Sequence, residues 1–299
     1  MWRRSSRESF PPKNIPLNSV SSIEDLRRQI AEWRTAGERI AFVPTMGNLH
    51  EGHLKLVDAA KANADRVVVS IFVNPMQFGA DEDLDAYPKT PEQDSSLLDG
   101  RGADLLFRPI VADIYPSGTN EPTFVEVPEI SDILCGASRP SHFRGVTTVV
   151  AKFFNMVQPD VALFGEKDLQ QLISIRRMTT ELNFPIEIIG VPIVREIDGL
   201  AMSSRNGYLS ESERAIAPRL YEIIKDLATE LDKGVSEYSL LEQQTTKKID
   251  AVGFKCDYIV IRRATDLSEP KTGDKLLAIL VAARLGRTRL IDNMVVTLD

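Results

Sequence analysis

The sequence predicts an α/β fold, in which a parallel sheet has helices on both faces and a smaller α+β domain follows. Two observations predict it. Between residues 21 and 193, short runs rich in apolar and β-branched residues alternate with longer helical patterns, which is typical of a parallel sheet. After about residue 194, helical patterns come first and strand patterns close the chain. We therefore expect a larger domain over 21–193, a smaller one over 194–299 and a mobile tail over 1–20.

The larger domain opens with an amphipathic helix pattern, SSIEDLRRQIAEWRTAG. Its Ser21 and Glu24 match a capping box, and Gly37 is a stop signal. Strand patterns then cover 39–45, 66–74, 103–109, 160–166 and 186–194, and helix patterns cover 50–64, 145–157 and 169–182. Strands that alternate with helices in this way are joined by crossovers, which place helices on both faces of the sheet.

The smaller domain begins with a second capping box, Ser210 with Glu213, which opens a long helix pattern through Gly234. Another helix pattern follows. The chain then reads as a strand over 256–264 and a hairpin over 276–296 that turns at Gly286. These elements predict a compact α+β unit.

Composition narrows the class of protein. The 299 residues suit about two domains, and 43% hydrophobic residues suffice for a full core. A net charge of -7 disfavours nucleic-acid binding, and the longest apolar run, 276–283, is too short for a membrane span of about 20 residues. Cys135 and Cys256 form no CxxC pair, which favours a reducing, cytoplasmic location. The first residues lack an apolar signal core, so we interpret them as a tail, with a transit peptide as the alternative.

Polar clusters follow several predicted strands. They read PTMGNLHEGH, NPMQFG and FGEKDLQQ, and a fourth, LAMSSRNGY, lies at the predicted domain junction. Parallel sheets bind ligands beyond the carboxyl ends of their strands, so we expect these clusters to meet at one edge.

The first cluster suggests an anion site. Gly47 allows a sharp turn out of the strand, and the helix after it presents N–H groups to a phosphate. His50 and His53, three residues apart, lie on one face of the first turn and can both donate to that phosphate. Two alternatives are open: the histidines are ordinary surface or core residues, or they bind zinc together with His142 or a cysteine.

The other clusters have ordinary alternatives too. Lys167 can neutralise a phosphate and Asp168 can accept from a ribose hydroxyl, or both belong to a solvated charge cluster. The SSR stretch at 203–205 offers donors to a polyphosphate, or is a plain turn. Gln77 and Gln171 can orient a small acid, or can cap loops.

Taken together, the motifs resemble a known family. PTMGNLHEGH, SIFVNPMQF, YPKT, SHFRGV, FGEKDLQQL and LAMSSRNGYLS, in this order and spacing, are similar to the AMP-forming pantoate-beta-alanine ligases, within the HxGH nucleotidyltransferases. The resemblance runs from about residue 21 to the RLIDN segment at 289–293. It departs at Leu169, where the family often has an aromatic residue, and in about fourteen extra residues at the start.

The resemblance implies a fold, a reaction and partners. The larger domain would be Rossmann-like, the smaller domain would act as a lid, and the protein would be a homodimer. With Mg²⁺ accompanying ATP, the enzyme would condense (R)-pantoate with β-alanine to give pantothenate, AMP and pyrophosphate through pantoyl adenylate. Such a ligation works by positioning and charge neutralisation.

The resemblance also implies site residues. His53 matches the family's proton-donor histidine, with His50, Lys167 and Arg205 acting beside it on the phosphates. Gln77 and Gln171 match the pantoate-binding glutamines, Gln77 lying also near β-alanine, and Asp94 is a candidate for contacting magnesium. The implied ATP site comprises Met46, Gly47, Asn48, Leu49, His50, Glu51, Gly52, His53, Gly165, Glu166, Lys167, Asp168, Val194, Met202, Ser203, Ser204 and Arg205.

Two other functions fit part of the pattern. One is a nucleotidyltransferase that stops after nucleotidyl transfer, and the other is a non-catalytic nucleotide-binding regulator. The two glutamines favour the ligase, because a pure ATP sensor has no need of a pocket for a second small molecule.

Overall fold

The computed structural model describes residues 17–79, 84–119 and 122–298. The predicted tail at 1–16 lies outside these residues. Asn18–Val20 were predicted to belong to the tail, but they form the short edge strand β1, which pairs with Leu105–Phe107. Val20 supplies a β-branched residue there, and the segment is too short for its pattern to stand out from a polar terminus.

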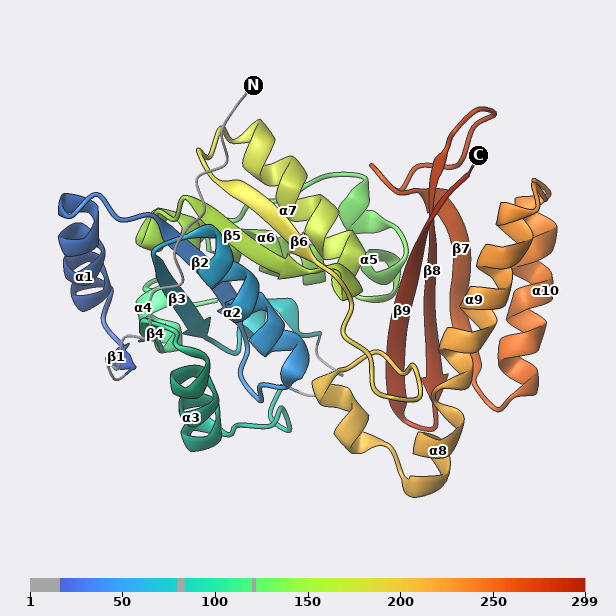
Figure 1. The fold of residues 1–299 in the computed structure, drawn as a ribbon, viewed down its shortest axis with the longest axis horizontal. Coiled ribbons are helices and arrows are strands. Elements are labelled where there is room, and N and C mark those ends of the chain that lie inside the picture. The colour runs from blue at the N-terminus through green and yellow to red at the C-terminus, as the bar shows by residue number, and fades with distance from the viewer. Residues whose placement is uncertain (1–16, 80–83, 120–121, 299) are drawn as a thin grey trace.

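A six-stranded parallel sheet forms the larger part of the molecule (Figure 1). Its strand order is β1-β4-β3-β2-β5-β6. The strands are β1 (Asn18–Val20), β2 (Ile40–Thr45), β3 (Arg66–Ile71), β4 (Leu105–Phe107), β5 (Val161–Gly165) and β6 (Glu187–Val191). All the pairings in this sheet are parallel, as the alternation of strand and helix patterns predicted.

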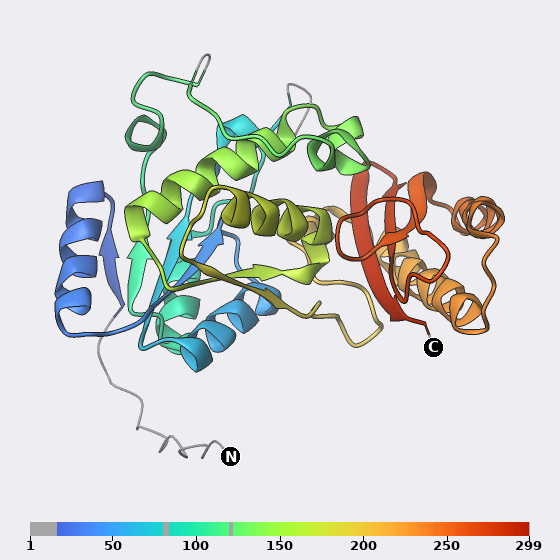
Figure 2. The same ribbon diagram turned by 90° about the horizontal axis from the view of Figure 1, so that it is seen from above.

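Helices cover both faces of this sheet, because its central strands bury side chains on both sides (Figure 2). Phe42 of β2 packs in the hydrophobic core on one face of the sheet, and its neighbour Val43 packs in the core on the other face, as the two-residue period of a strand requires. Helices α1 (Ile23–Thr35), α6 (His142–Val157) and α7 (Leu169–Glu181) pack on the first face, and α2 (Glu51–Asn63) and α3 (Pro91–Arg101) on the second. The predicted Rossmann-like layering is therefore confirmed.

The smaller part is an antiparallel sheet with helices on one face. Strands β7 (Lys255–Arg263), β8 (Leu276–Leu285) and β9 (Thr288–Thr297) lie in that order, and α9 (Arg219–Asp232) and α10 (Tyr238–Ala251) cover one side (Figure 1). Ile279 of β8 packs in the core beneath these helices, whereas Leu280 joins the core of the parallel sheet. The two parts therefore share apolar packing. The predicted boundary at residue 193 stays a prediction.

Several element boundaries differ from the predictions. The first helix is capped by Ser22, whose side chain accepts from the N–H of Asp25, so the predicted Ser21–Glu24 box is wrong by one residue. The long helix predicted from Ser210 is broken: α8 (Glu211–Ile216) ends before Pro218, which has no N–H to continue the helix. Helix α3 and the short helices α4 (Val111–Ile114) and α5 (Cys135–Ser138) were not predicted.

Two of the predictions for the smaller part are confirmed. Ser210 and Glu213 form the predicted capping box of α8, and the final hairpin turns at Gly286 with a left-handed φ of 56°. Within the described residues, no helix is long and apolar enough to cross a membrane.

Candidate active site

The strand order places the candidate site at the centre of the sheet. From β2, the chain proceeds to β3 and β4 on one side, and it later returns to β5 and β6 on the other. The loops that leave β2 and β5 therefore diverge and leave a crevice between them, which is where such sheets bind ligands. A cavity of about 930 Å³ lies there, lined by residues of both parts of the molecule.

Most of the predicted site residues line this cavity. They are Met46, His50, Gly52, His53, Gln77, Gly165, Lys167, Asp168, Gln171, Val194, Met202, Ser203, Ser204 and Arg205. Gly47, Asn48, Leu49, Glu51, Glu166 and Asp94 do not line it. Gly47, Asn48, Leu49 and Glu166 lie close to lining residues in the chain, whereas Glu51 begins α2 and Asp94 lies on α3.

Asp94 holds the loop that joins β2 to α2. Its carboxylate is 1% exposed and accepts from the backbone N–H groups of Asn48 and Leu49 at 3.0 and 2.8 Å. Thr90 donates its hydroxyl to the same carboxylate at 3.0 Å. A Cβ at Gly47, where φ is 85°, would stand 3.0 Å from this carboxylate, so the turn needs glycine.

These contacts bear on the predicted magnesium contact at Asp94. Both of its oxygens are engaged by donors and buried, so they favour a role in holding the loop over one in binding a cation. Among the described residues, no cluster of three or more His, Cys, Asp or Glu side chains could hold a metal ion. The magnesium role of Asp94 stays an untested prediction.

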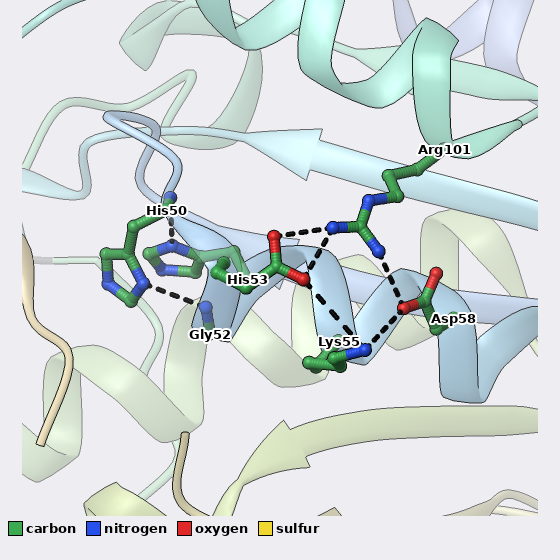
Figure 3. A network of polar contacts seen from close by, with 7 residues as sticks. His50, Gly52, His53, Lys55, Asp58 and Arg101 are labelled. Carbon is green, nitrogen blue, oxygen red and sulfur yellow. Dashed lines mark hydrogen bonds and ion pairs between the residues drawn. The ribbon is translucent and has the colours of Figure 1, made fainter. Parts of the chain in front are cut away.

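The two histidines form the amino-terminal cap of α2 (Figure 3). His50 is the cap residue, where we expected it within the first turn, and its Nδ1 accepts from the N–H of Gly52 at 3.1 Å. His53 Nδ1 in turn accepts from the N–H of His50 at 3.3 Å. Each ring therefore uses Nδ1 as an acceptor, which leaves the proton of the neutral ring on Nε2.

Burial and neighbouring charge keep both rings neutral. Loss of solvation, and then the positive charge of Lys167, lower the pKa of His50 to about 4. Loss of solvation, the charge of His50 and that of Lys167 lower the pKa of His53 to about 3. The ring centroids are 4.1 Å apart, so positive charges on both rings, each carrying a second proton, would repel each other. At neutral pH, the pair offers two Nε2–H donors without a positive charge.

Glu51 belongs to a network that also contains Lys55, Asp58 and Arg101, three residues labelled in Figure 3. Arg101, at the end of α3, donates to both Glu51 oxygens at 2.5 Å and to Asp58 at 2.8 Å. Lys55 lies 3.9 Å from Glu51 and 3.3 Å from Asp58. Glu51, Lys55 and Asp58 are spaced three or four residues apart and so share one face of α2, and this network joins that face to α3. The Glu51 side chain is held there by Arg101 and does not line the cavity.

Asn293 of β9 supports the segment after β5. Its side-chain amide is 5% exposed and donates to the carbonyl oxygens of Glu166 and Lys167, each at 2.9 Å. The adjacent Asp292 binds Arg195 through two contacts of 2.6 and 2.9 Å. The position of Lys167 is therefore tied to the smaller sheet as well as to its own strand.

The SSR stretch at 203–205 forms another part of the cavity wall. Ser203 caps a short 3₁₀ turn, Ser204–Tyr208, by accepting from the N–H of Arg205 at 3.3 Å. Ser204 donates its hydroxyl to the carbonyl oxygen of Asn48 at 3.2 Å. This contact brings the SSR turn against the loop after β2, as the shared-edge argument predicted.

The NPMQ turn after β3 forms the wall beside Gln77. Asn74, 1% exposed, donates to the carbonyl oxygen of Gly145 at 3.0 Å and accepts from the Tyr115 hydroxyl at 2.8 Å. Helix α6 lies so close to this turn that a Cβ at Gly145 would be 2.3 Å from the Met76 carbonyl oxygen. The Gln77 amide lies 2.7 Å from the sulfur of Met46, which joins this wall to the loop after β2.

The two glutamines on α7 differ in role. Gln171 lines the cavity, as predicted. Gln170 is buried, donates to the carbonyl oxygens of Ile130 and Ile133 at 2.7 and 2.8 Å, and accepts from the N–H of Cys135. It fixes the segment that leads into α6.

Three residues in or beside the site were not predicted from their chemistry: Asn74, Arg139 and Asn293. His142, which also lines the cavity, was considered only as a zinc ligand. All of them lie in or beside the stretches NPMQF, SHFRGV and RLIDN. No local pattern in these stretches indicates which distant residue each side chain contacts. Their importance depends on packing between distant segments, which a short motif does not reveal.

Comparison with protein families and curated relatives agrees with this geometry. The model of the Pantoate-beta-alanine ligase family matches residues 18–295. The pantothenate synthetase of Shewanella oneidensis is 56% identical over 272 residues, which cover 91% of this chain and 96% of that protein. The pantothenate synthetase of Methylococcus capsulatus is 54% identical over 283 residues, covering 95% and 99%.

Solved structures show the same architecture. The fold is similar to that of pantothenate synthetase from Thermus thermophilus, with a TM-score of 0.87 and 44% identity over 93% of this chain and 99% of that one. It is also similar to pantoate-beta-alanine ligase from Francisella tularensis, solved in complex with beta-gamma ATP and beta-alanine. That match has a TM-score of 0.79 and 35% identity, and it covers 93% and 97% of the two chains.

Proposed function

This chain belongs to the pantoate-beta-alanine ligase family, and on that premise we propose how its cavity carries out the reaction. It is an ATP-dependent ligase that joins pantoate to β-alanine through an amide bond. In the first step, the carboxylate of (R)-pantoate attacks the α-phosphorus of ATP, which gives pantoyl adenylate and pyrophosphate. In the second, the amine of β-alanine attacks the adenylate carbonyl, loses a proton and displaces AMP, which yields pantothenate.

The ATP phosphates bind between the loops after β2 and β5. Lys167 and Arg205, which line the cavity from different segments of the chain, supply positive charge, and Ser203 and Ser204 add hydroxyl donors. His50 and His53 direct their Nε2–H groups at the phosphates, because their Nδ1 atoms are occupied by backbone N–H groups. His53 thus serves as a hydrogen-bond donor to the developing charge, which is electrostatic catalysis with fixed groups.

Pantoate binds beside Gln77 and Gln171, which line the cavity next to the predicted phosphate site. Their amides can donate to and accept from its hydroxyls, while Met46 and Phe164 offer apolar surface. Because the reaction needs two reactants in line, the value of this wall lies in holding the pantoate carboxylate close to the α-phosphorus.

Magnesium, assembly and location complete the proposal. Mg²⁺ would accompany ATP as part of the substrate and would supply positive charge to its phosphates. The protein acts as a homodimer in the cytoplasm.

One observation carries the proposal: predicted phosphate-binding and acid-binding residues, distant in sequence, line a single cavity at the point where the order of the parallel strands reverses. A site for a nucleotide alone would not require the wall of amides beside it.

Isotope exchange tests whether pantoyl adenylate forms as an intermediate. With pantoate, Mg-ATP and labelled pyrophosphate, the enzyme should return label to ATP in the absence of β-alanine, because the first step is reversible. Addition of β-alanine should then give pantothenate and AMP. No exchange would rule out the adenylate route. Exchange without amide formation would identify a nucleotidyltransferase that stops after the first step, and ATP binding without either would identify a regulator.

A further inference from the structure

The end of the β8–β9 hairpin lies beside the proposed phosphate site. Arg284 stands near the end of β8, Arg287 follows Gly286 in the turn, and both arginines line the cavity. Strand β9 lies close to the turn that holds Lys167 and also to the SSR turn. A Cβ at Gly286 would overlap the Glu213 carboxylate, so the hairpin turn lies against α8, the helix after the SSR turn (Figure 1). The hairpin therefore carries two arginines to the side of the cavity where the ATP phosphates are proposed to bind.

The cavity is a positive region in a negative molecule. Among the described residues that line it, six side chains are lysine or arginine and two are carboxylates, Asp168 and Asp292. Asp292 is also paired with Arg195. The whole chain carries a net charge of -7. Such a molecule repels an approaching anion at long range, whereas a cleft lined by cations concentrates an attractive field at its opening.

The acidic neighbours of the hairpin arginines are shared with other donors. Arg284 Nε lies 3.8 Å from one oxygen of Asp257, and the other oxygen accepts from Arg289 at 2.8 Å. The charge of Arg287 acts on Glu213, whose carboxylate also belongs to the capping box of α8. Three arginines at this end of the hairpin thus meet two carboxylates. Positive charge is left over where the hairpin borders the cavity.

Solvent exposure decides how this charge acts. The Arg284 side chain is 50% exposed, and Arg287 is exposed as well. A hydrated guanidinium adds little to a fixed contact, because water screens it and its side chain loses freedom. Its field nevertheless extends beyond contact distance at low salt, since the Debye length is about 30 Å at 0.01 M. Cations at the rim of a site therefore change the rate at which an anion arrives more than the strength with which it is held.

We propose that Arg284 and Arg287 guide ATP into the cavity by attracting its phosphates before contact, and that they do not hold the nucleotide once it is bound. This inference rests on the proposed function and deepens it, because it gives the smaller sheet a part in recruiting the polyphosphate substrate. Lys167 and Arg205 then act on the phosphates at short range. The expected signature is an association rate that depends on these arginines at low salt, and a dissociation rate that does not.

The test follows an ATP with a fluorescent label on its ribose, mixed with enzyme and Mg²⁺ in a stopped-flow instrument. At about 0.01 M salt, Arg284→Gln/Arg287→Gln should bind it about 3- to 10-fold more slowly than the wild type, a part of the roughly 10- to 1000-fold gain that a charged cleft gives. At about 1 M salt, where the Debye length is about 3 Å, the two proteins should associate at equal rates. Dissociation should stay within about twofold of wild type at both salt concentrations, as for other rim charges.

Arg28→Gln/Arg39→Gln is the matched control, because it changes the net charge of the chain by the same amount. Arg28 lies on α1 and Arg39 precedes β2, at the end of the sheet away from the loops that form the cavity. Both are exposed and paired with a carboxylate, and neither lines the cavity. This variant should keep the association rate of the wild type and its dependence on salt.

The outcomes distinguish the inference from its premise. Failure of the wild type to bind the labelled ATP would overturn the proposed phosphate site itself. If the wild type binds and the hairpin variant associates as fast at low salt, or if the control variant slows as much, the guiding role is wrong. A loss that persists at about 1 M salt, or one that appears in dissociation, would mean that the arginines contact the bound nucleotide, and the inference would again be wrong.

Discussion

At the scale of single residues, the histidine pair shows how backbone contacts set side-chain chemistry. The spacing of His50 and His53 predicted that they would lie together, which the structure bears out with ring centroids 4.1 Å apart. The spacing could not predict which nitrogen carries the proton, because this depends on two backbone N–H groups in a turn. Nor could it predict how far burial lowers the pKa of each ring.

The titration of these rings is directly measurable, since the chain has only three histidines. In nitrogen-edited NMR spectra, His50 and His53 should appear as neutral Nε2–H tautomers and should stay neutral down to about pH 5, because their pKa values are about 4 and about 3. Variants His50→Gln and His53→Gln assign the signals. A ring that titrates near pH 6.5 would contradict the burial argument.

The same shifts predict how stability depends on pH. Both folded pKa values lie below the value of 6.5 for unfolded histidine, so acid favours the unfolded chain. The stabilisation that comes from keeping the rings neutral is present in full above about pH 6.5. It is lost as pH falls toward 4, at roughly 1.4 kcal/mol of unfolding free energy per pH unit for each histidine. Between about pH 6 and pH 5, the free energy of unfolding of His53→Gln should change with pH less steeply than that of the wild type. The difference in slope should be the contribution of one histidine. Equal slopes for the variant and the wild type would contradict the prediction.

At the scale of elements, close packing of α6 on the NPMQ turn decides the shape of the cavity wall. Gly145 permits this approach, and Asn74 bonds across it. The helix itself was predictable from its apolar period. Its neighbour across the turn was not, because one glycine in a helix pattern carries no information about which backbone lies against it.

Gly145→Ala should displace that turn. The new Cβ would meet the Met76 carbonyl oxygen at 2.3 Å, and overpacking of this kind costs about 1–3 kcal/mol. We expect a lower melting temperature together with a higher KM for pantoate. Gly100→Ala on α3 is the control, because no atom of the described residues lies within 4 Å of its new Cβ and alanine favours helix by roughly 0.5–1 kcal/mol. Wild-type kinetics in Gly145→Ala would show that the turn tolerates the shift.

The elements also show where sequence reasoning succeeds. Every strand of the parallel sheet except β1 was predicted, because runs such as RVVVSI are apolar and bounded by turn residues. The break between α8 and α9 was missed, although Pro218 could have indicated it. Contacts made by Asp94 and Asn293 could not be predicted, since each joins segments that only the completed fold brings together.

At the scale of the whole molecule, the candidate site is built jointly by two sheets. Asn293 reaches from β9 to the backbone of Lys167, and Leu280 of β8 packs in the core of the parallel sheet. A movement of the smaller sheet would therefore alter the position of the proposed phosphate-binding lysine.

Asn293→Ala should weaken that link. Two backbone carbonyls lose their donor, at a cost of about 1–3 kcal/mol, and Lys167 loses part of its support. We expect a higher KM for ATP and slower exchange of pyrophosphate into ATP. Asn155→Ala, which removes a bond to the Ala151 carbonyl oxygen on exposed α6 surface, should change neither. Equal behaviour of the two variants would mean that β9 does not position Lys167.

The pairing of β2 with β5 has a consequence for how the protein folds. Ala41 pairs with Val161 and Phe42 with Ala162, so strands far apart in the chain must meet before the crevice exists. Pairing across such sequence separation is slow, because the entropy of closing a long loop is lost before the contact is gained. A chain that has formed its helices but not this pairing has no place for a nucleotide. We therefore expect competence to bind ATP to return late in refolding, after the secondary structure has formed.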